Sequence, residues 1–401
     1  METSTSDPLP KVILRRSAER AIAGRHPWIL ASAIEDLSRP VHEGEYVDVC
    51  QADGKWLGRG IFNPHSRIRV RVYCWKKEDE AWFEGRLKAA IAFRKSFAKG
   101  TPNEAQRIVF SEADQLSGLI VDRYADYIVV QQTAAAITPF LPQCVEQLVE
   151  AYAPKGILKR IDEKSAASEG LTPGQEWLYG SSPQGSIEIE DNGLRWQIDL
   201  EEGQKTGYYL DQRQNRRVAA DWMKPGGRAL DVCCYVGGFA LSIAKWGNAS
   251  EVVAIDTSAK AIEQAKFHAT LNGIHQVDFR VGDFYDSLES LRAANETFDL
   301  VVLDPPRLAG SRSQIDSALR AYHRLNVLGI QVLRPGGILV TCSCSGRVDR
   351  ESFNQMLMGA SRRAGRDLQV LERRAAAVDH PSVITCPETD YLKCYVCRVL
   401  G

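Results

Sequence analysis

The sequence lacks a long hydrophobic run. Its first ten residues, METSTSDPLP, contain no apolar stretch of the kind found in secretion signals. No later segment reaches the roughly 20 apolar residues that a membrane-spanning helix needs. We therefore expect a soluble, cytoplasmic protein without a membrane partner.

The sequence also lacks an excess of charge of either sign. Its 50 lysine and arginine residues nearly cancel 51 aspartate and glutamate residues, which leaves a net charge of −1. This balance excludes a protein coated with basic charge for nucleic-acid binding, although local basic faces remain open.

Cysteine is too sparse for a disulfide framework, with 10 residues in a chain of 401. We expect free thiols in a reducing compartment. Cys394 and Cys397 form one CxxC inside a strand-like run, but no second pair follows at the spacing of a zinc site. We interpret both as core residues and predict no metal.

A length of 401 residues exceeds one ordinary core and indicates two or three domains. Residues 1–76 alternate short β-type runs with Gly, Pro and Asn, which predicts a small β domain. Residues 77–190 hold a helical stretch near 81–98 and then a strand, turn and strand, which indicates a central α/β domain. In residues 191–401 strands and helices alternate, as is typical of a doubly wound parallel sheet.

Two segments concentrate basic residues. In SRIRVRVY the two-residue period of a strand puts Arg67, Arg69 and Arg71 on one face. Such a face can contact RNA phosphates or be merely solvated, and the pattern favours neither. The second segment, GQKTGYYLDQRQNRR, carries four candidates for RNA binding: Lys205, Arg213, Arg216 and Arg217.

Acidic residues recur where apolar runs end, and ligands of parallel sheets bind at these carboxyl ends. The aspartates are Asp231, Asp256, Asp283 and Asp304. Asp256 has the place, about 20 residues beyond the glycine turn, of an acid that binds ribose hydroxyls. The turn has Gly237 and Gly238 but is no GxGxxG, so S-adenosylmethionine, which has no phosphate, fits better than a dinucleotide. Helix capping explains one or two of the four aspartates.

Other polar residues are interpreted as structural. A turn rich in Asp, Ser and Gly accounts for Glu112, Asp114 and Asp122. Four isolated histidines are expected to be surface or hydrogen-bonded structural residues: His26, His268, His323 and His380.

Two cysteines close the strand-like run ILVTCSC. Alternation puts Cys342 and Cys344 on the same face, so the pleat alone cannot choose between them. Cys344 lies nearer the carboxyl end, next to Ser345 and Gly346, where the chain turns at the ligand edge. We favour Cys344 as a nucleophile over the alternative that both cysteines fill the core.

Several segments together carry a family resemblance: GQKTGYYLDQRQNR, LDVCCYVGGFAL, LDPPR and TCSCSG, with RHPW, EADQLSGLIVDRYADY, DHP and YLK elsewhere. The chain resembles the bacterial 5-methylcytosine methyltransferases of large-subunit ribosomal RNA that have an N-terminal PUA domain. The resemblance implies a PUA-like RNA-binding domain, a central α/β domain and a class I (Rossmann-like) methyltransferase domain that uses S-adenosylmethionine. The sequence departs from the family at three positions. Val236 stands where threonine is common, Arg307 where lysine is common, and Cys342 where an aromatic residue is common.

The resemblance also assigns residues. It gives Cys344 as the nucleophile, and for the cofactor it gives Asp231, Tyr235, Gly237, Gly238, Asp256, Asp283 and Asp304. The chemistry agrees, because cytosine C5 becomes nucleophilic only after a thiolate adds to C6. Asp304, fixed by the rigid pair Pro305-Pro306, could hold the base edge at N3 and N4.

Two alternatives remain open at this stage. Asp-Pro-Pro could hold an exocyclic amine for N-methylation, which would leave Cys344 structural. The chain could instead be a catalytically idle RNA-binding assembly factor. The target nucleotide and the formation of a homodimer cannot be read from the sequence, because RNA specificity comes from folded shape and flipped bases.

Overall fold

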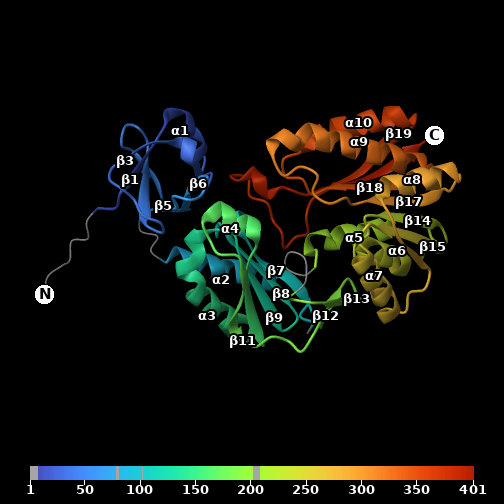
Figure 1. Cartoon of the computed structure of the whole chain (residues 1–401), viewed down its shortest axis with the longest axis horizontal. Helices are drawn as coiled ribbons and strands as arrows, with labels where there is room; N and C mark the ends of the chain where they lie inside the picture. The colour runs from blue at the N-terminus through green and yellow to red at the C-terminus, as the bar shows by residue number, and fades with distance from the viewer. Residues whose placement is uncertain (1–7, 78–80, 102, 202–207) are drawn as a thin grey trace. The chain divides into compact units, whose positions relative to one another are not determined.

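The computed structural model describes residues 8–77, 81–101, 103–201 and 208–401, which form two compact units (Figure 1). The first unit comprises the described residues of Met1–Ile189, Ile198–Tyr208 and Asp379–Thr389. The second comprises Glu190–Gln197, Tyr209–Val378 and Asp390–Gly401. Two short segments that follow residue 191 thus pack with the first unit, whereas we expected one continuous domain over 191–401.

A six-stranded sheet opens the first unit, as the β-type runs predict. Its strand order is β2-β6-β5-β4-β1-β3. The strands are β1 Lys11–Leu14, β2 Trp28–Leu30, β3 Ile34–Leu37, β4 Tyr46–Cys50, β5 Trp56–Phe62 and β6 Ile68–Cys74, with helix α1 at Arg16–Ala23. Gly54, at a φ of 86°, makes the turn between β4 and β5, because a left-handed backbone suits glycine.

A five-stranded sheet with order β11-β10-β9-β8-β7 completes the first unit. Its elements are β7 Ala105–Phe110, β8 Leu119–Tyr124, β9 Tyr127–Gln132, β10 Gly156–Ile161, β11 Gly174–Gly180, α2 Trp82–Lys95, α3 Leu141–Tyr152 and α4 Glu163–Glu169. The predicted helix near 81–98 and the strand, turn and strand that follow it are confirmed. Trp82 of α2 stacks on Tyr73 of β6 with ring centroids 4.3 Å apart, so α2 shares a core with the first sheet.

The second unit contains the predicted doubly wound sheet. Its strand order is β16-β15-β14-β17-β18-β20-β19, parallel except for β20, which is antiparallel to β18 and β19. The strands are β14 Arg228–Val232, β15 Glu251–Asp256, β16 Val277–Val281, β17 Phe298–Leu303, β18 Leu333–Ser343, β19 Asp367–Arg374 and β20 Lys393–Leu400. A two-stranded sheet of β12 Ile187–Asp191 and β13 Leu194–Ile198 precedes it.

Helices cover both faces of this sheet (Figure 1). They are α5 Arg213–Asp221, α6 Gly238–Trp246, α7 Ala259–Leu271, α8 Phe284–Ala293, α9 Ile315–Gln331 and α10 Arg350–Ala364. Burial on both faces explains why strands such as FDLVVL are almost continuously apolar. None of the helices in the described residues is long and apolar enough to cross a membrane.

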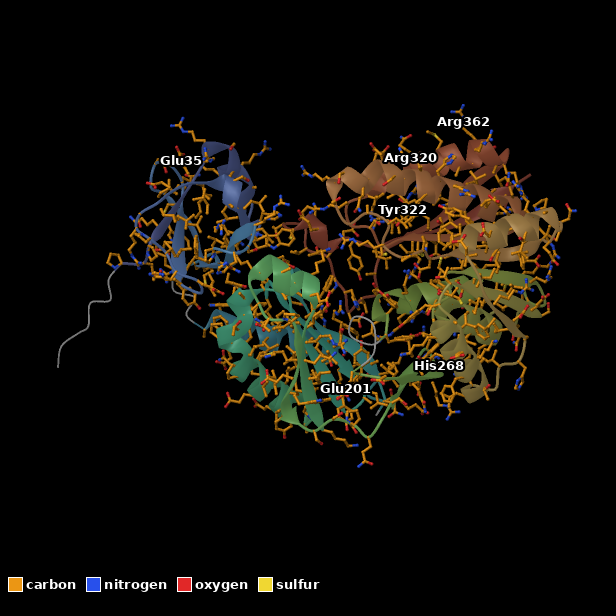
Figure 2. All side chains as sticks on the ribbon, viewed as in Figure 1. Glu35, Glu201, His268, Arg320, Tyr322 and Arg362 are labelled. Carbon is orange, nitrogen blue, oxygen red and sulfur yellow. The ribbon has the colours of Figure 1, made fainter. Side chains whose placement is uncertain are left out.

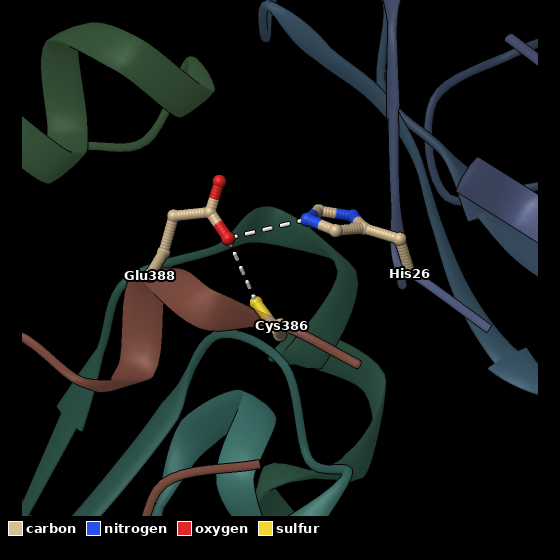
Figure 3. A group of neighbouring side chains, drawn as sticks. All are labelled: His26, Cys386 and Glu388. Carbon is tan, nitrogen blue, oxygen red and sulfur yellow. Dashed lines mark hydrogen bonds and ion pairs between the residues drawn. The ribbon is translucent and has the colours of Figure 1, made fainter. Parts of the chain in front are cut away.

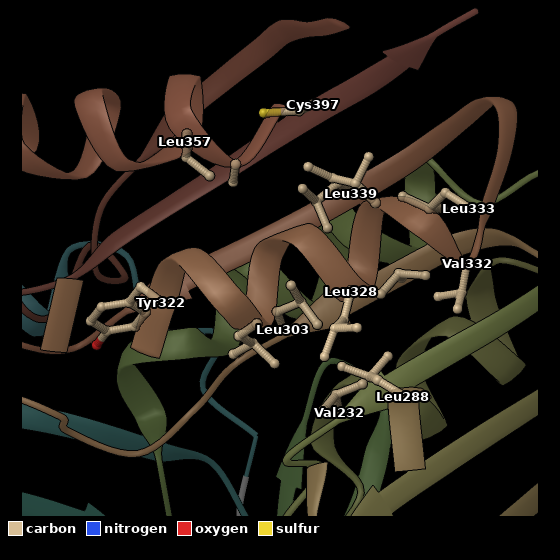
Figure 4. Packing of buried hydrophobic residues seen from close by; sticks show 14 of the residues in the cluster. Val232, Leu288, Leu303, Tyr322, Leu328, Val332, Leu333, Leu339, Leu357 and Cys397 are labelled. Atoms are coloured by element: carbon tan, nitrogen blue, oxygen red, sulfur yellow. The ribbon is translucent and has the colours of Figure 1, made fainter. Parts of the chain in front are cut away.

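The core of the second unit lies between its central strands and α9. Leu303 of β17, Leu339 of β18 and Leu328 of α9 pack in one cluster (Figure 4). Each fully buried side chain of this kind stabilises the fold by about 1.5–3 kcal/mol. Tyr322 of α9 also belongs to the cluster, whereas Arg362 of α10 is exposed on the outer surface (Figure 2).

Candidate active site

Four parallel strands of the second unit end at one edge of the sheet, and each carries a predicted functional residue there. Asp231 lies near the end of β14, and Asp256 ends β15. Asp304 directly follows β17, and Cys344 directly follows β18. The neighbours are in register, since Leu303 pairs with Thr341. The fold therefore brings residues separated by more than 100 positions to a common edge, as predicted from their places in the runs.

The end of β18 separates the two cysteines. Cys342 lies inside the strand, opposite Cys394 of β20, and its side chain is fully buried. The interaction with Cys394 and the burial both raise the pKa of the Cys342 thiol. Cys344 lies beyond the last strand residue, is half-buried, and has its Sγ 3.9 Å from the carbonyl oxygen of Pro305. Of the two, only Cys344 is partly exposed.

Asp304 stands beside Cys344 at the start of the Asp-Pro-Pro turn. Its Oδ1 accepts a hydrogen bond of 3.0 Å from Gln212 Nε2, and its backbone N–H donates to the carbonyl of Val232. These contacts fix the direction of the carboxylate. Gln212, just before α5, is a residue that sequence reasoning missed, although it lies inside the quoted motif GQKTGYYLDQRQNR.

The glycine turn begins α6 and has the backbone that a closely approaching ligand needs. Gly237 has a φ of 88°, and Tyr235 also has a positive φ, of 50°. A Cβ on Gly237 would lie 3.3–3.4 Å from Phe279, Ala265 and Leu241, so a larger side chain would be strained at this φ and would need its neighbours to shift. The turn therefore presents main chain to the sheet edge.

Asp231 is hydrogen-bonded to the helix that follows the glycine turn. The carboxyl group is fully buried, and its Oδ2 accepts a 2.8 Å hydrogen bond from the Ala240 N–H in the first turn of α6. Burial, with further contributions from Asp304 and Asp256, raises the pKa of Asp231 to about 8. Asp231 therefore supports the glycine turn from inside the fold, and its contact with the cofactor stays a prediction.

Asp256 and Asp283 differ in role. The Asp256 carboxylate is half-buried and accepts hydrogen bonds of 2.9 Å from the N–H groups of Tyr235 and Ser258. It is thus bound to the glycine turn, in the place of a ribose-binding acid.

Asp283 is exposed and is the N-cap of α8, where its Oδ1 accepts a hydrogen bond from the Tyr285 N–H. The expectation that capping explains one or two of the aspartates is confirmed for Asp283.

These residues fit S-adenosylmethionine. A carboxylate at the end of the second strand can accept hydrogen bonds from ribose hydroxyls, and a side-chain-free turn lets the chain approach the ligand. The rings of Tyr209 and Tyr235 lie edge to face at 5.3 Å, beside the same turn. Such rings offer apolar surface to a nucleobase.

The predicted basic face on β6 is wrong for Arg71. Its side chain is buried, with an exposed fraction of 6%, and it donates 2.9 Å hydrogen bonds to Glu169 and Ser117. Arg69 is half-buried and donates to the carbonyls of Asn63 and Pro64. Arg67 is exposed and precedes the strand. The face is therefore reduced to Arg67 and part of Arg69.

The second basic segment is also corrected. Arg213 and Arg216 both bind Asp191, and Arg216 is buried with its guanidinium against Gly238 of the glycine turn. A buried residue such as Arg216 does not form an RNA-binding surface, whereas Arg213 is half-buried and its contact with RNA stays a prediction. Arg217 is exposed, beside Asp221. Lys205 lies outside the described residues.

Polar residues interpreted as structural have the expected partners. Asp114 binds Arg94, Asp122 binds Arg107, and Glu112 accepts hydrogen bonds from Trp28 and Ser117. His268 is buried in α7, with its ring nitrogens at the carbonyls of Val236 and Gln197. These residues hold the fold together.

One group of potential metal ligands occurs in the described residues: His26, Cys386 and Glu388 of the first unit. Glu388 lies between the other two (Figure 3), with Oε2 3.2 Å from His26 Nε2 and 3.5 Å from Cys386 Sγ. His26 Nδ1 accepts the Trp28 N–H, so Nε2 carries the proton and donates to Glu388. A metal-bound imidazole needs the opposite tautomer. The three residues form a hydrogen-bonded structural contact, as predicted for His26.

Comparisons with known proteins identify the family. Residues 12–75 match the PUA-like domain, and residues 167–393 match the S-adenosylmethionine-dependent methyltransferases. Ribosomal RNA large subunit methyltransferase I of Shewanella denitrificans is 38% identical over 396 residues, covering 97% of this chain and 99% of the relative. The same enzyme of Salmonella typhi is 35% identical over 405 residues and covers both chains completely.

Solved structures show the same fold. A methyltransferase crystallised with SAH superposes with a TM-score of 0.84 at 19% identity, covering 97% of this chain and 100% of that chain. A methyltransferase from Streptococcus mutans gives 0.82 at 18% identity with the same coverage. The chain therefore belongs to the family of S-adenosylmethionine-dependent methyltransferases that includes the ribosomal RNA large subunit methyltransferases I, and S-adenosylmethionine is its cofactor.

Proposed function

We propose that this protein methylates C5 of a cytosine in large-subunit ribosomal RNA, with Cys344 as the covalent nucleophile. The names of the full-length relatives support the RNA substrate, and the PUA-like domain supports RNA binding. The observation that carries the reaction type is the position of Cys344. This half-buried residue lies just beyond β18, and its sulfur is 3.9 Å from the carbonyl oxygen of Pro305, the residue that follows Asp304.

The thiolate of Cys344 attacks C6 of cytosine, and the C5–C6 π electrons move to C5 as the S–C6 bond forms. S-adenosylmethionine supplies an electrophilic methyl group, which C5 takes with loss of the thioether. A base then removes the C5 proton, and the electrons of that C–H bond restore the double bond and expel the thiolate. Cys344 is thus regenerated in each turnover.

Asp304 orients the base in this scheme. Its carboxyl group, held by Gln212, is protonated when the base binds: one oxygen accepts a hydrogen bond from the exocyclic N4 amine, and the other gives its proton to N3, where negative charge grows as C6 is attacked. N3 returns this proton to Asp304 when the double bond is restored and the thiolate is expelled. The role therefore needs Asp304 close to Cys344, which adjacent β17 and β18 provide.

The test is to incubate the protein with deproteinised ribosomal RNA and labelled S-adenosylmethionine and to locate the methyl group by mass spectrometry. We expect 5-methylcytosine. A methyl group on an exocyclic nitrogen would favour the Asp-Pro-Pro amine mechanism and contradict the role of Cys344. Calorimetry that shows RNA binding without S-adenosylmethionine binding would instead indicate an idle assembly factor.

A further inference from the structure

Lys393 places a buried ammonium group beside the turn that carries Cys344. It is the first residue of β20 and pairs with Ser343 at the end of β18. The residue has an exposed fraction of only 1%. Nζ donates hydrogen bonds of 2.8 Å to the carbonyls of Ser345 and Tyr391. The ammonium is therefore bound to the residue that directly follows the proposed nucleophile in the chain.

The same turn is held from its other side. Ser345 is fully buried, and its Oγ accepts hydrogen bonds of 3.1 Å from the N–H groups of Leu308 and Ala309, which follow the Asp-Pro-Pro turn. The Tyr322 hydroxyl forms a hydrogen bond of 3.0 Å with the same Oγ. Lys393 and Ser345 thus clamp the backbone of the turn between two elements of the site.

A fully buried lysine is uncommon, because removing an ammonium from water is costly. Burial lowers the pKa of Lys393 to about 8, while Asp390, Cys344 and Asp349 act to raise it and Arg350 acts to lower it. A group with a pKa near 8 still carries its proton at pH 7. Nζ also donates to two carbonyl oxygens, as suits an ammonium group, and Cys344 is among the groups that its charge acts on.

We propose that Lys393 is a positioning residue for methyl transfer: it fixes the turn that carries Cys344 and places a positive charge at that turn. A nearby cation favours the thiolate, which is the nucleophilic form of cysteine. The inference rests on the proposed function, because it assigns the charge a use only if Cys344 attacks the substrate. It explains why the sheet retains an ammonium where an apolar side chain would fill the space at lower cost.

The test measures ionisation of Cys344 without turnover. Iodoacetamide reacts with the thiolate, so its rate at Cys344, followed by peptide fragmentation and mass spectrometry over a pH series, gives the midpoint of ionisation. In the native protein we expect this midpoint below the value of about 8.5 of a free thiol. Lys393→Met should raise it by about one pH unit or more, because the opposite charge is lost. Lys393→Arg should restore part of the shift.

Lys224→Met is the matched control, since Lys224 is an exposed lysine of the same unit and carries no role in the site. It should leave the midpoint and turnover unchanged. In Lys393→Met, turnover on saturating RNA should fall about tenfold, in line with one unit of thiol pKa, while affinity for S-adenosylmethionine stays within about twofold. A loss of affinity equal to the loss of turnover would indicate a merely structural residue and overturn the proposal.

A native midpoint at or above about 8.5 would also overturn it, and this result does not depend on whether a variant folds. The two proposals fail differently. An unchanged midpoint and turnover in Lys393→Met, together with an inactive Cys344→Ala, would remove the role of Lys393 and keep the nucleophile. An active Cys344→Ala would remove the proposed function itself.

Discussion

Strand β6 of the first unit and the carboxyl edge of the second unit behave differently, although the sequence predicts a functional group of side chains at each. At the carboxyl edge, Asp256, Asp304 and Cys344 come together as expected. On β6 the predicted row of arginines is divided, because Arg71 is buried against Glu169 while Arg67 is exposed.

The difference has a physical cause. Parallel strands in register end at one edge, so residues that close successive runs converge whatever lies between them. The alternation of a single strand says which side chains share a face, but it does not say what covers that face. On β6 the cover comes from residues about 40 and 100 positions later, Glu112 and Glu169.

The largest effect is expected on turnover, from variants of the two cysteines at the carboxyl edge. Cys344→Ala should lower turnover at least ~10³-fold, as loss of a covalent nucleophile does, while S-adenosylmethionine still binds. Cys342→Ser, two residues earlier in the same strand run, is the matched control and should keep substantial activity. Methyl transfer to RNA and calorimetry of cofactor binding provide the measurements. Equal loss in the two folded variants would reverse the choice of cysteine.

The next effect tests the burial of Arg71. Arg71→Met should reduce the free energy of unfolding by about 3 kcal/mol, because it leaves the Glu169 carboxylate buried without its cation. Arg67→Met should change it by less than about 0.5 kcal/mol, as is usual for a surface residue. Urea unfolding compares the two. Similar stability of both variants would show that Arg71 contributes no more than an exposed arginine.

Asp256 should have a smaller effect, confined to the cofactor. Asp256→Ala is expected to weaken S-adenosylmethionine binding about tenfold, since hydrogen bonds to a charged group contribute about 1.5–3 kcal/mol and water replaces part of them. Asp278→Ala on neighbouring β16, an exposed aspartate paired with Arg280, is the control. Calorimetry that gave the same affinity for Asp256→Ala and the native protein would count against the proposed ribose contact.

The smallest effect concerns what remains of the basic face. Arg67→Glu should weaken RNA binding a few-fold and reduce the slope of log K against log salt by about 1, because one phosphate contact is lost. Arg16→Glu, an exposed charge reversal on α1 of the same unit, controls for net charge. An unchanged salt slope in Arg67→Glu alone would show that Arg67 is only solvated.

Much of the fold could be predicted from the sequence, for the same reason as the residues at the carboxyl edge of the sheet. Alternating runs such as FDLVVL and EVVAID predict buried parallel strands, and the residue after each run marks the edge. The segment Asp379–Thr389 could not be foreseen in the first unit, since its tie through His26 and Glu388 joins residues 362 positions apart. Lys393 was also missed, because a lysine that opens a strand looks solvent-exposed in the sequence.

The proposed reaction requires a covalent bond between Cys344 and the base, and trapping that bond tests it directly. Ribosomal RNA made with 5-fluorocytidine can be attacked at C6 and methylated at C5, but it then has no C5 proton to lose, so the thiolate cannot be expelled. With S-adenosylmethionine present, we expect a stable protein–RNA adduct whose nuclease-resistant nucleotide is located on Cys344 by mass spectrometry. Absence of any adduct on Cys344, under conditions where ordinary RNA is methylated, would contradict the account.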